Sequence, residues 1–176
     1  MLVNFSLGGM FALLAPYAKL WIGGSASTYG FMLAAFSLGL FVGAYFIGKL
    51  RQVREYVGKL QIVGVIAMDA IMTLIGLATI QFASIALLFG FGFVLSSLDA
   101  PLQALYQAKV PQELFGRVVT VVIALLSIIQ PLSVAISENM AVFFTIGGAY
   151  VIYGVLTISV AIGVSFGFSE LRMAEY

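Results

Sequence analysis

The chain has 176 residues, of which 62% are hydrophobic and only 9% are charged, and its mean hydropathy is +1.15. Soluble domains carry roughly 25% charged residues, so this composition indicates an integral membrane protein. The net charge of +1 gives no sign of nucleic-acid binding. Because there is no cysteine and no histidine, disulfides, thiolate nucleophiles, a Ser-His dyad and His-liganded metal or haem sites are excluded. We therefore expect neither an enzyme nor a bound cofactor or metal.

Apolar runs long enough to cross a membrane as helices follow one another along the whole chain. Each crossing takes about 20 residues, and the runs cover about residues 2–22, 29–47, 61–80, 84–106, 118–137 and 142–166. The first run contains Pro16, has no basic residue before it and exceeds the usual signal-peptide length of about 7–15 apolar residues. We interpret it as a true span. Short links leave no room for a soluble domain, so the prediction is an all-α six-helix transmembrane bundle over residues 1–176.

Lysine and arginine are distributed unevenly between the two sides of the predicted bundle. Only Lys19 falls on one side. The basic residues of the other side are Lys49, Arg51, Arg54, Lys59, Lys109, Arg117 and Arg172. Short basic loops stay in the cytoplasm. The pattern predicts a multi-pass protein of the plasma or inner membrane with both termini cytoplasmic.

Glycines at GxxxG spacing occur in the second run, as Gly39 and Gly43, and in the sixth, as Gly163 and Gly167. Small residues let helix backbones approach closely in a membrane, where lipid supplies no hydrophobic drive for association. We interpret both pairs as packing contacts without a chemical role.

Polar residues form a stripe in the fourth run, which also contains Pro101. They are Ser96, Asp99, Gln103 and Tyr106. Spacings of three and four place them on one helix face, and the proline removes a backbone hydrogen bond there. Because polar groups are costly in hydrocarbon, this face is a candidate wall of a solvated pathway.

The fifth run carries a second polar set, Ser127, Gln130 and Ser137, beside Pro131. Two proline-interrupted helices with polar faces favour a substrate pathway lined by these groups. The alternative is that the polar groups only bond to neighbouring helices.

Asp69 stands near the middle of the third run, on a face shared with Val65, Thr73 and Gly76. No basic residue lies at its depth, and burial in hydrocarbon favours the neutral acid. Two interpretations stay open: a proton-coupling site, or a protonated carboxyl that donates one structural hydrogen bond. Asp99 is a second candidate proton site.

The segment from Asp99 to Val118, DAPLQALYQAKVPQELFGRV, is the most specific motif in the chain. It resembles the link between the tenth and eleventh helices of major facilitator superfamily transporters, in the branch of macrolide-efflux and siderophore-export proteins. Physically, Pro111 ends a helix and Arg117 places a positive charge near the lipid surface. Gly116 belongs to the same motif.

The resemblance extends over the rest of the chain. The AP of Ala15 and Pro16, the YG of Tyr29 and Gly30, and the glycine-rich run into GKLRQVR are similar to the seventh and eighth helices of that family. The family's cytoplasmic motif, G-x-L-x-D-R-x-G-R-R, is only partly present. The chain keeps its Gly48 and Leu50, but Gln52 stands where the acidic residue is expected. Arg54 is a further candidate residue of the same cytoplasmic loop.

The resemblance implies the C-terminal half of a twelve-helix secondary transporter, whose substrate cavity lies between two halves. It also implies proton-coupled efflux of amphipathic small molecules. The expected partners are the lipid bilayer, the small-molecule substrate, and either an N-terminal six-helix half or a second copy of the chain.

Two other classes of function are considered. A non-transporting scaffold or a channel subunit would pack against partner helices, but it would not need polar stripes on two proline-interrupted helices. An intramembrane aspartyl protease is disfavoured, because neither Asp69 nor Asp99 lies in the expected GxGD sequence.

Overall fold

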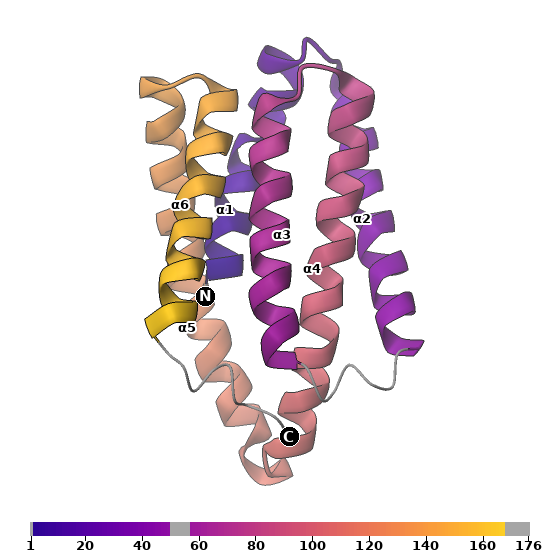
Figure 1. The fold of residues 1–176 in the computed structure, drawn as a ribbon, viewed down its shortest axis with the longest axis vertical. Coiled ribbons are helices and arrows are strands. Elements are labelled where there is room, and N and C mark those ends of the chain that lie inside the picture. The colour runs from indigo at the N-terminus through magenta and orange to yellow at the C-terminus, as the bar shows by residue number, and fades with distance from the viewer. Residues whose placement is uncertain (1, 50–56, 168–176) are drawn as a thin grey trace.

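The computed structural model describes residues 2–49 and 57–167, and every regular element within them is helical. The all-α prediction is thus confirmed. The elements in chain order are α1 (Leu2–Pro16), the π-helix η1 (Tyr17–Trp21), α2 (Ala26–Lys49), α3 (Val57–Leu77), α4 (Gln81–Lys109), α5 (Gln112–Phe143) and α6 (Ile146–Gly167). They form an upright bundle in which successive long helices run in opposite directions (Figure 1).

Four of these helices are long and apolar enough to cross a membrane: α2, α3, α4 and α5. The chain is therefore a membrane protein, as its composition predicts. The first predicted span corresponds to α1 followed directly by η1. The last corresponds to α6, in which Ile146–Ser159 form a shorter apolar stretch.

Helix α5 is longer than the predicted span of residues 118–137 that lies inside it. Val110 has the extended backbone usual before a proline, with φ −86° and ψ 123°, and Pro111 then caps the start of α5. At the other end, Asn139 lies on the helix surface, where its Nδ2 donates to the Ala135 carbonyl at 2.7 Å. The next turn comes only at residues 144–145, so α6 begins later than the predicted residue 142.

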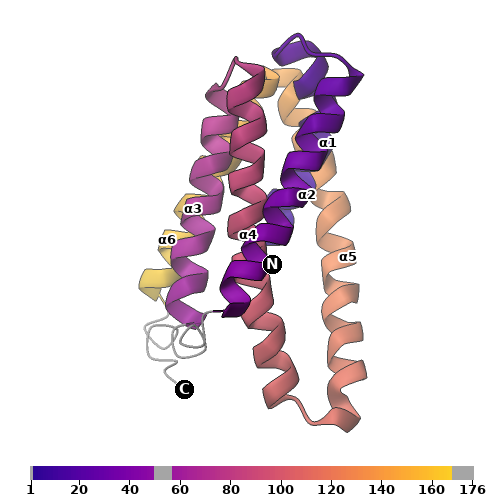
Figure 2. The ribbon, with the colours of Figure 1, turned by 90° about the vertical axis from the view of Figure 1, so that its right-hand side faces the viewer.

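The helices pair in a pattern that repeats itself. Helix α2 packs mainly on α4, α1 on α5 and α3 on α6, with further contacts of α3 with α4 and of α1 with α6. Exchanging α1 with α4, α2 with α5 and α3 with α6 maps this set of contacts onto itself. The exchanged helices run in opposite directions along the bundle (Figures 1 and 2). The main helix pairs are thus related by an inverted exchange of two three-helix units, α1–α3 with η1 and α4–α6.

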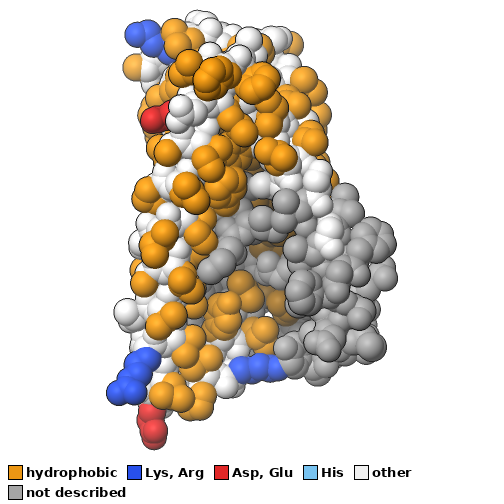
Figure 3. All heavy atoms as spheres, turned by 90° about the vertical axis from the view of Figure 1, so that its left-hand side faces the viewer, with side chains coloured by type: hydrophobic (Ala, Val, Ile, Leu, Met, Phe, Trp, Pro, Cys, Tyr) orange, Lys and Arg blue, Asp and Glu red, His pale blue; other side chains and the backbone are white. Residues whose placement is uncertain are grey.

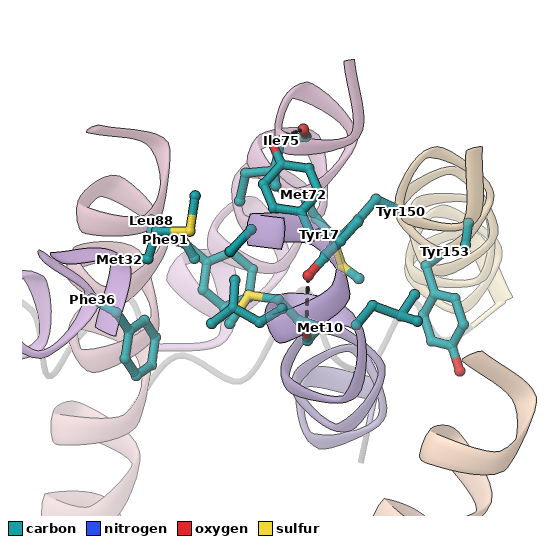
Figure 4. Close-up of a cluster of buried hydrophobic side chains, with 14 of the residues drawn as sticks. Met10, Tyr17, Met32, Phe36, Met72, Ile75, Leu88, Phe91, Tyr150 and Tyr153 are labelled. Carbon is teal, nitrogen blue, oxygen red and sulfur yellow. Dashed lines mark hydrogen bonds between the residues drawn. The ribbon is translucent and has the colours of Figure 1, made fainter. Parts of the chain in front are cut away.

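The apolar core lies where both units meet, towards the end of the bundle that carries η1. It is built from α1, η1, α2, α3, α4 and α6 and contains large side chains from each (Figure 4). Phe36 and Phe91 rings lie 6.3 Å apart between centroids, and Tyr17 and Tyr150 meet edge to face at 5.2 Å. The core therefore joins the two three-helix units.

Glycines bring α2 and α4 into backbone contact. A Cβ atom on Gly39 would lie 2.1 Å from the Phe89 carbonyl oxygen, and one on Gly43 would lie 2.4 Å from that of Phe93. The packing role predicted for this pair is confirmed. Gly163 has open space where its Cβ would be, and the side-chain position of Gly167 lies outside the described residues.

Candidate functional site

One face of α4 is buried in the core in the first part of the helix and exposed further along. Leu88, Leu95, Asp99 and Tyr106 follow one another at helical spacings of seven, four and seven, so they share one face. Leu88 and Leu95 are buried in the core, whereas Asp99 is exposed and Tyr106 is half-buried. Gln103, one turn beyond Asp99, is also exposed. A polar face thus continues directly from the buried core.

This face is exposed because no described helix covers it towards the basic end, the end of the bundle where α2 and α4 finish at Lys49 and Lys109. Helix α1 begins part-way along the bundle, and below its start α4 and α5 extend on their own to the turn that joins them (Figure 2). In the described part of the chain, α4 and α5 make almost no direct contact. At the opposite end, by contrast, η1 and the helix ends pack together.

Ser96 is separated from the rest of the predicted α4 stripe. It is buried, and a Cβ on Gly43 of α2 would lie 2.3 Å from its Oγ. Its hydroxyl donates to the Phe93 carbonyl at 3.3 Å. The structure therefore places Ser96 in the contact between α2 and α4, while Asp99 and Gln103 remain exposed.

The polar residues of α5 divide in a similar way. Ser127 and Gln130 are exposed, and the Ser127 hydroxyl donates to the Ile123 carbonyl of its own helix at 2.9 Å. Ser137 is buried and donates to the Ser133 carbonyl at 2.7 Å. None of residues 112–132 is buried. Buried residues in α5 begin at Ser133, although the Gln130 carbonyl already lies near Gly8 of α1.

Asp69 is fully buried where α3 meets α6. Thr73 donates its hydroxyl to the Asp69 carbonyl at 3.0 Å, and a Cβ on Gly154 of α6 would lie 2.6 Å from that carbonyl oxygen. Asp69 shares its face with Thr73 and Gly76, as predicted, and Gly76 also contacts α6. The backbone of Asp69 is therefore part of a close helix contact and its side chain is buried, whereas Asp99 lies on an exposed face.

A polar cluster that the sequence did not reveal lies beyond Pro16. The Tyr17 hydroxyl lies 2.7 Å from the Ile75 carbonyl oxygen, 3.1 Å from that of Ala78 and 2.7 Å from Ser84 Oγ. A proline withholds one helical amide, and the chain continues from it as a π-helix that turns Tyr17 towards the end of α3. The available signal was a tyrosine directly after a proline within an apolar run, since a buried phenol needs a partner.

Hydroxyl groups also join α1, α5 and α6. The Ser133 hydroxyl donates to the Phe5 carbonyl, and Tyr153 donates to the Ser133 carbonyl at 2.7 Å. Tyr150 donates to the Met10 carbonyl at 2.8 Å (Figure 4). Polar side chains of this kind hold membrane helices together.

The predicted loop motifs lie at or beyond the basic end. Gly48 is exposed with open space beside it, while Leu50 and Arg54 lie outside the described residues. Pro111, Gly116 and Arg117 are exposed at and after the turn between α4 and α5. Charged side chains gather near the two ends of the face in Figure 3, with hydrophobic side chains between them.

No protein-family model matches this chain, and no curated protein or solved structure is significantly similar to it. Within the described residues, no group of three or more acidic side chains could hold a metal ion.

Proposed function

We propose that the chain is one half of a proton-coupled secondary transporter that exports amphipathic small molecules, similar to the C-terminal half of a major facilitator. The observation that carries this proposal is the exposed inner face of α4, where Asp99, Gln103 and Tyr106 continue directly from the apolar core. Ionisable residues in membrane spans are costly and mark pathways or proton relays by default. An inward face of this kind gives the half a wall of a substrate cavity.

The inverted pairing of the helices supports the proposal. Halves of major facilitators contain nested inverted repeats of three helices, and exchanging α1–α3 with α4–α6 preserves the main helix pairs of this bundle. In transporters built from inverted repeats, motion consists largely of rocking around a fixed site near the bilayer midplane. The scaffold reading explains neither this symmetry nor the exposed carboxyl group.

Each residue of the face has a chemical role in the proposal. The Asp99 carboxyl exchanges a proton or accepts a cationic group, Gln103 offers both a donor and an acceptor, and the Tyr106 ring supplies an apolar surface with a polar tip. On α5, Gln130 and Ser127 add further polar groups, and both are exposed. An amphipathic substrate matches a wall of this mixed character.

The proposed transporter needs a second six-helix unit. Polar groups that face lipid without partners cost several kcal/mol each, and one wall cannot enclose a substrate. The partner is a separate N-terminal half or a second copy of this chain. Both suit an axis along the membrane normal, which relates the parallel halves of major facilitators.

The experiment measures proton-driven transport of an amphipathic fluorescent dye in inverted vesicles. The chain is expressed alone and as a covalent tandem of two copies, each with and without a proton gradient. We expect an assembled form to transport the dye only with a proton gradient. Asp99→Asn should alter the pH profile of transport, and Gln103→Ala should lower its rate. The matched control is Glu138→Gln, which neutralises an exposed carboxyl on α5 away from this face.

Three results would contradict the proposal. Dye flux at the same rate with and without a proton gradient would indicate a channel. Absence of flux in every assembled form would favour a scaffold. Transport unaffected at every pH by Asp99→Asn and Gln103→Ala would show that the α4 face is structural.

A further inference from the structure

One hydrogen bond crosses from α3 to α4 next to the proposed transport face. The side-chain amide Nε2 of Gln61 donates to the Leu98 carbonyl oxygen at 2.8 Å. Gln61 is half-buried and Leu98 is buried. The accepting carbonyl belongs to the peptide unit that joins Leu98 to Asp99, so this bond acts on the backbone immediately before the carboxyl-bearing residue.

The bonded carbonyl lies in the turn of α4 that Pro101 disturbs. Pro101 is buried inside the helix and has no amide hydrogen, so the Ser97 carbonyl loses its usual donor, and the ring crowds that carbonyl as well. Prolines are tolerated in membrane helices where neighbouring helices supply hydrogen bonds to the disturbed turn. Gln61 supplies one at Leu98, three residues before the proline.

The contact is built closely enough to be specific. Gly64, one turn after Gln61, lies against the same leucine: a Cβ at Gly64 would be 2.1 Å from Leu98 Cδ2. The missing side chain at this position lets α3 approach α4, so the Gln61 amide reaches the carbonyl. Asparagine is one methylene shorter, and an ionised glutamate has no hydrogen to donate.

We propose that Gln61 is a positioning residue, which holds the proline-disturbed turn of α4 and thereby fixes where Asp99 lies on the exposed face. Gln61 itself lies in the contact with α4 and is not part of the exposed stripe. The role of Asp99 in transport rests on the proposed function, but the positioning of its backbone does not. The inference can therefore be tested without any transport assay.

The test uses the absence of native cysteine. An Asp99→Cys reporter is labelled with a water-soluble thiol reagent in mild detergent, with Gln61 intact and in the Gln61→Leu and Gln61→Asn variants. Because a typical hydrogen bond controls populations by several-fold, we expect both variants to change the labelling rate by about threefold or more. A Gln112→Cys reporter, exposed at the start of α5, is the matched control and should keep its rate.

A double-mutant cycle with Pro101→Ala separates positioning from general packing. Alanine restores the amide that bonds to the Ser97 carbonyl, so the effect of Gln61→Leu on the Asp99→Cys thiol should shrink to less than half. Rates that stay unchanged in Gln61→Leu, that change equally at both reporters, or that change as much in the Pro101→Ala background would overturn the inference. If the cycle behaves as expected while Asp99→Asn leaves transport unaltered, only the proposed function fails.

Discussion

The Tyr17 hydroxyl offers a direct measure of how far buried hydrogen bonds hold the closed end of the bundle together. Tyr17→Phe removes one oxygen and keeps the ring, which is fully buried and packs edge to face on Tyr150. The hydroxyl has one proton to share among its three neighbours, and each neighbour keeps another bond. Ser84 Oγ also lies 3.2 Å from the Ile80 carbonyl, and the Ala78 carbonyl keeps the Trp21 Nε1 donor at 3.2 Å. The Ile75 carbonyl likewise keeps the Ala78 backbone amide as a donor at 3.1 Å.

The expected loss of stability follows from these remaining bonds. Hydrogen bonds between membrane helices contribute about 0.6 kcal/mol on average and up to about 1.7 kcal/mol, while leaving a buried acceptor without its partner costs about 1–3 kcal/mol. Since all three partners retain another bond, we expect Tyr17→Phe to lower the free energy of unfolding by about 0.5–1.5 kcal/mol, the range of an ordinary hydrogen bond. Adding Trp21→Phe removes the second donor to Ala78, so the double variant should lose more than the sum of the single variants.

The assay is reversible unfolding in mixed micelles, followed by circular dichroism as the mole fraction of denaturing detergent rises. Tyr45→Phe is the matched control, because it deletes the same atom from an exposed tyrosine and keeps the ring on which Lys49 lies at 4.2 Å. A loss below about 0.5 kcal/mol for Tyr17→Phe, the lower limit for an ordinary hydrogen bond, would refute the reasoning. So would strictly additive effects of Tyr17→Phe and Trp21→Phe.

Three further predictions concern topology, packing and assembly. Single cysteines at Gln112 and at Ser25 should react with an impermeant thiol reagent only from the cytoplasmic and only from the outer side, respectively; the reverse pattern would overturn the orientation. Gly39→Val should cost about 2–4 kcal/mol of stability in the same micelle assay, because the added side chain meets the Phe89 carbonyl and not a movable side chain. The control Gly30→Val, with open space beside the glycine, should cost far less. In mild detergent the active species should have a protein mass above that of one 18.8 kDa chain, and robust transport by a monomer would contradict the need for a partner.

The spans were predictable from the sequence because length and apolar character alone decide whether a helix crosses the bilayer. Helix ends were less predictable. Asn139 looked like part of a link because it is polar, but its amide bonds back to the Ala135 carbonyl of the same helix, so a single polar side chain did not end α5. Pro111 ended α4 as predicted, because a residue before proline avoids helical backbone angles.

The candidate site was predictable only as far as helical periodicity reaches. Spacing placed Ser96, Asp99 and Gln103 on related faces, but it could not tell that Gly43 covers Ser96 and that nothing described covers Asp99. The roles of Gln61 and Tyr17 escaped the sequence because both depend on contacts between helices that are far apart in the chain. Tyr17 directly follows Pro16, and Gln61 bonds to the turn of α4 that precedes Pro101. Helical periodicity does not predict such contacts near prolines.

The two equivalent helix pairs are held together by different means, and this difference bears on where a partner would bind. Helices α2 and α4 interlock through glycines that meet backbone carbonyls over several turns, from Gly92 against Phe36 to Gly43 against Phe93. Their counterparts, α5 and α1, are joined mainly around Ser133, and residues 112–132 of α5 have no buried member. The α2–α4 pair is thus in close contact over several turns, whereas the α1–α5 pair leaves residues 112–132 of α5 without a buried side chain. A second unit that covers this stretch would complete the pair and enclose the polar face in the same step, so assembly and formation of the proposed cavity are expected to be one event.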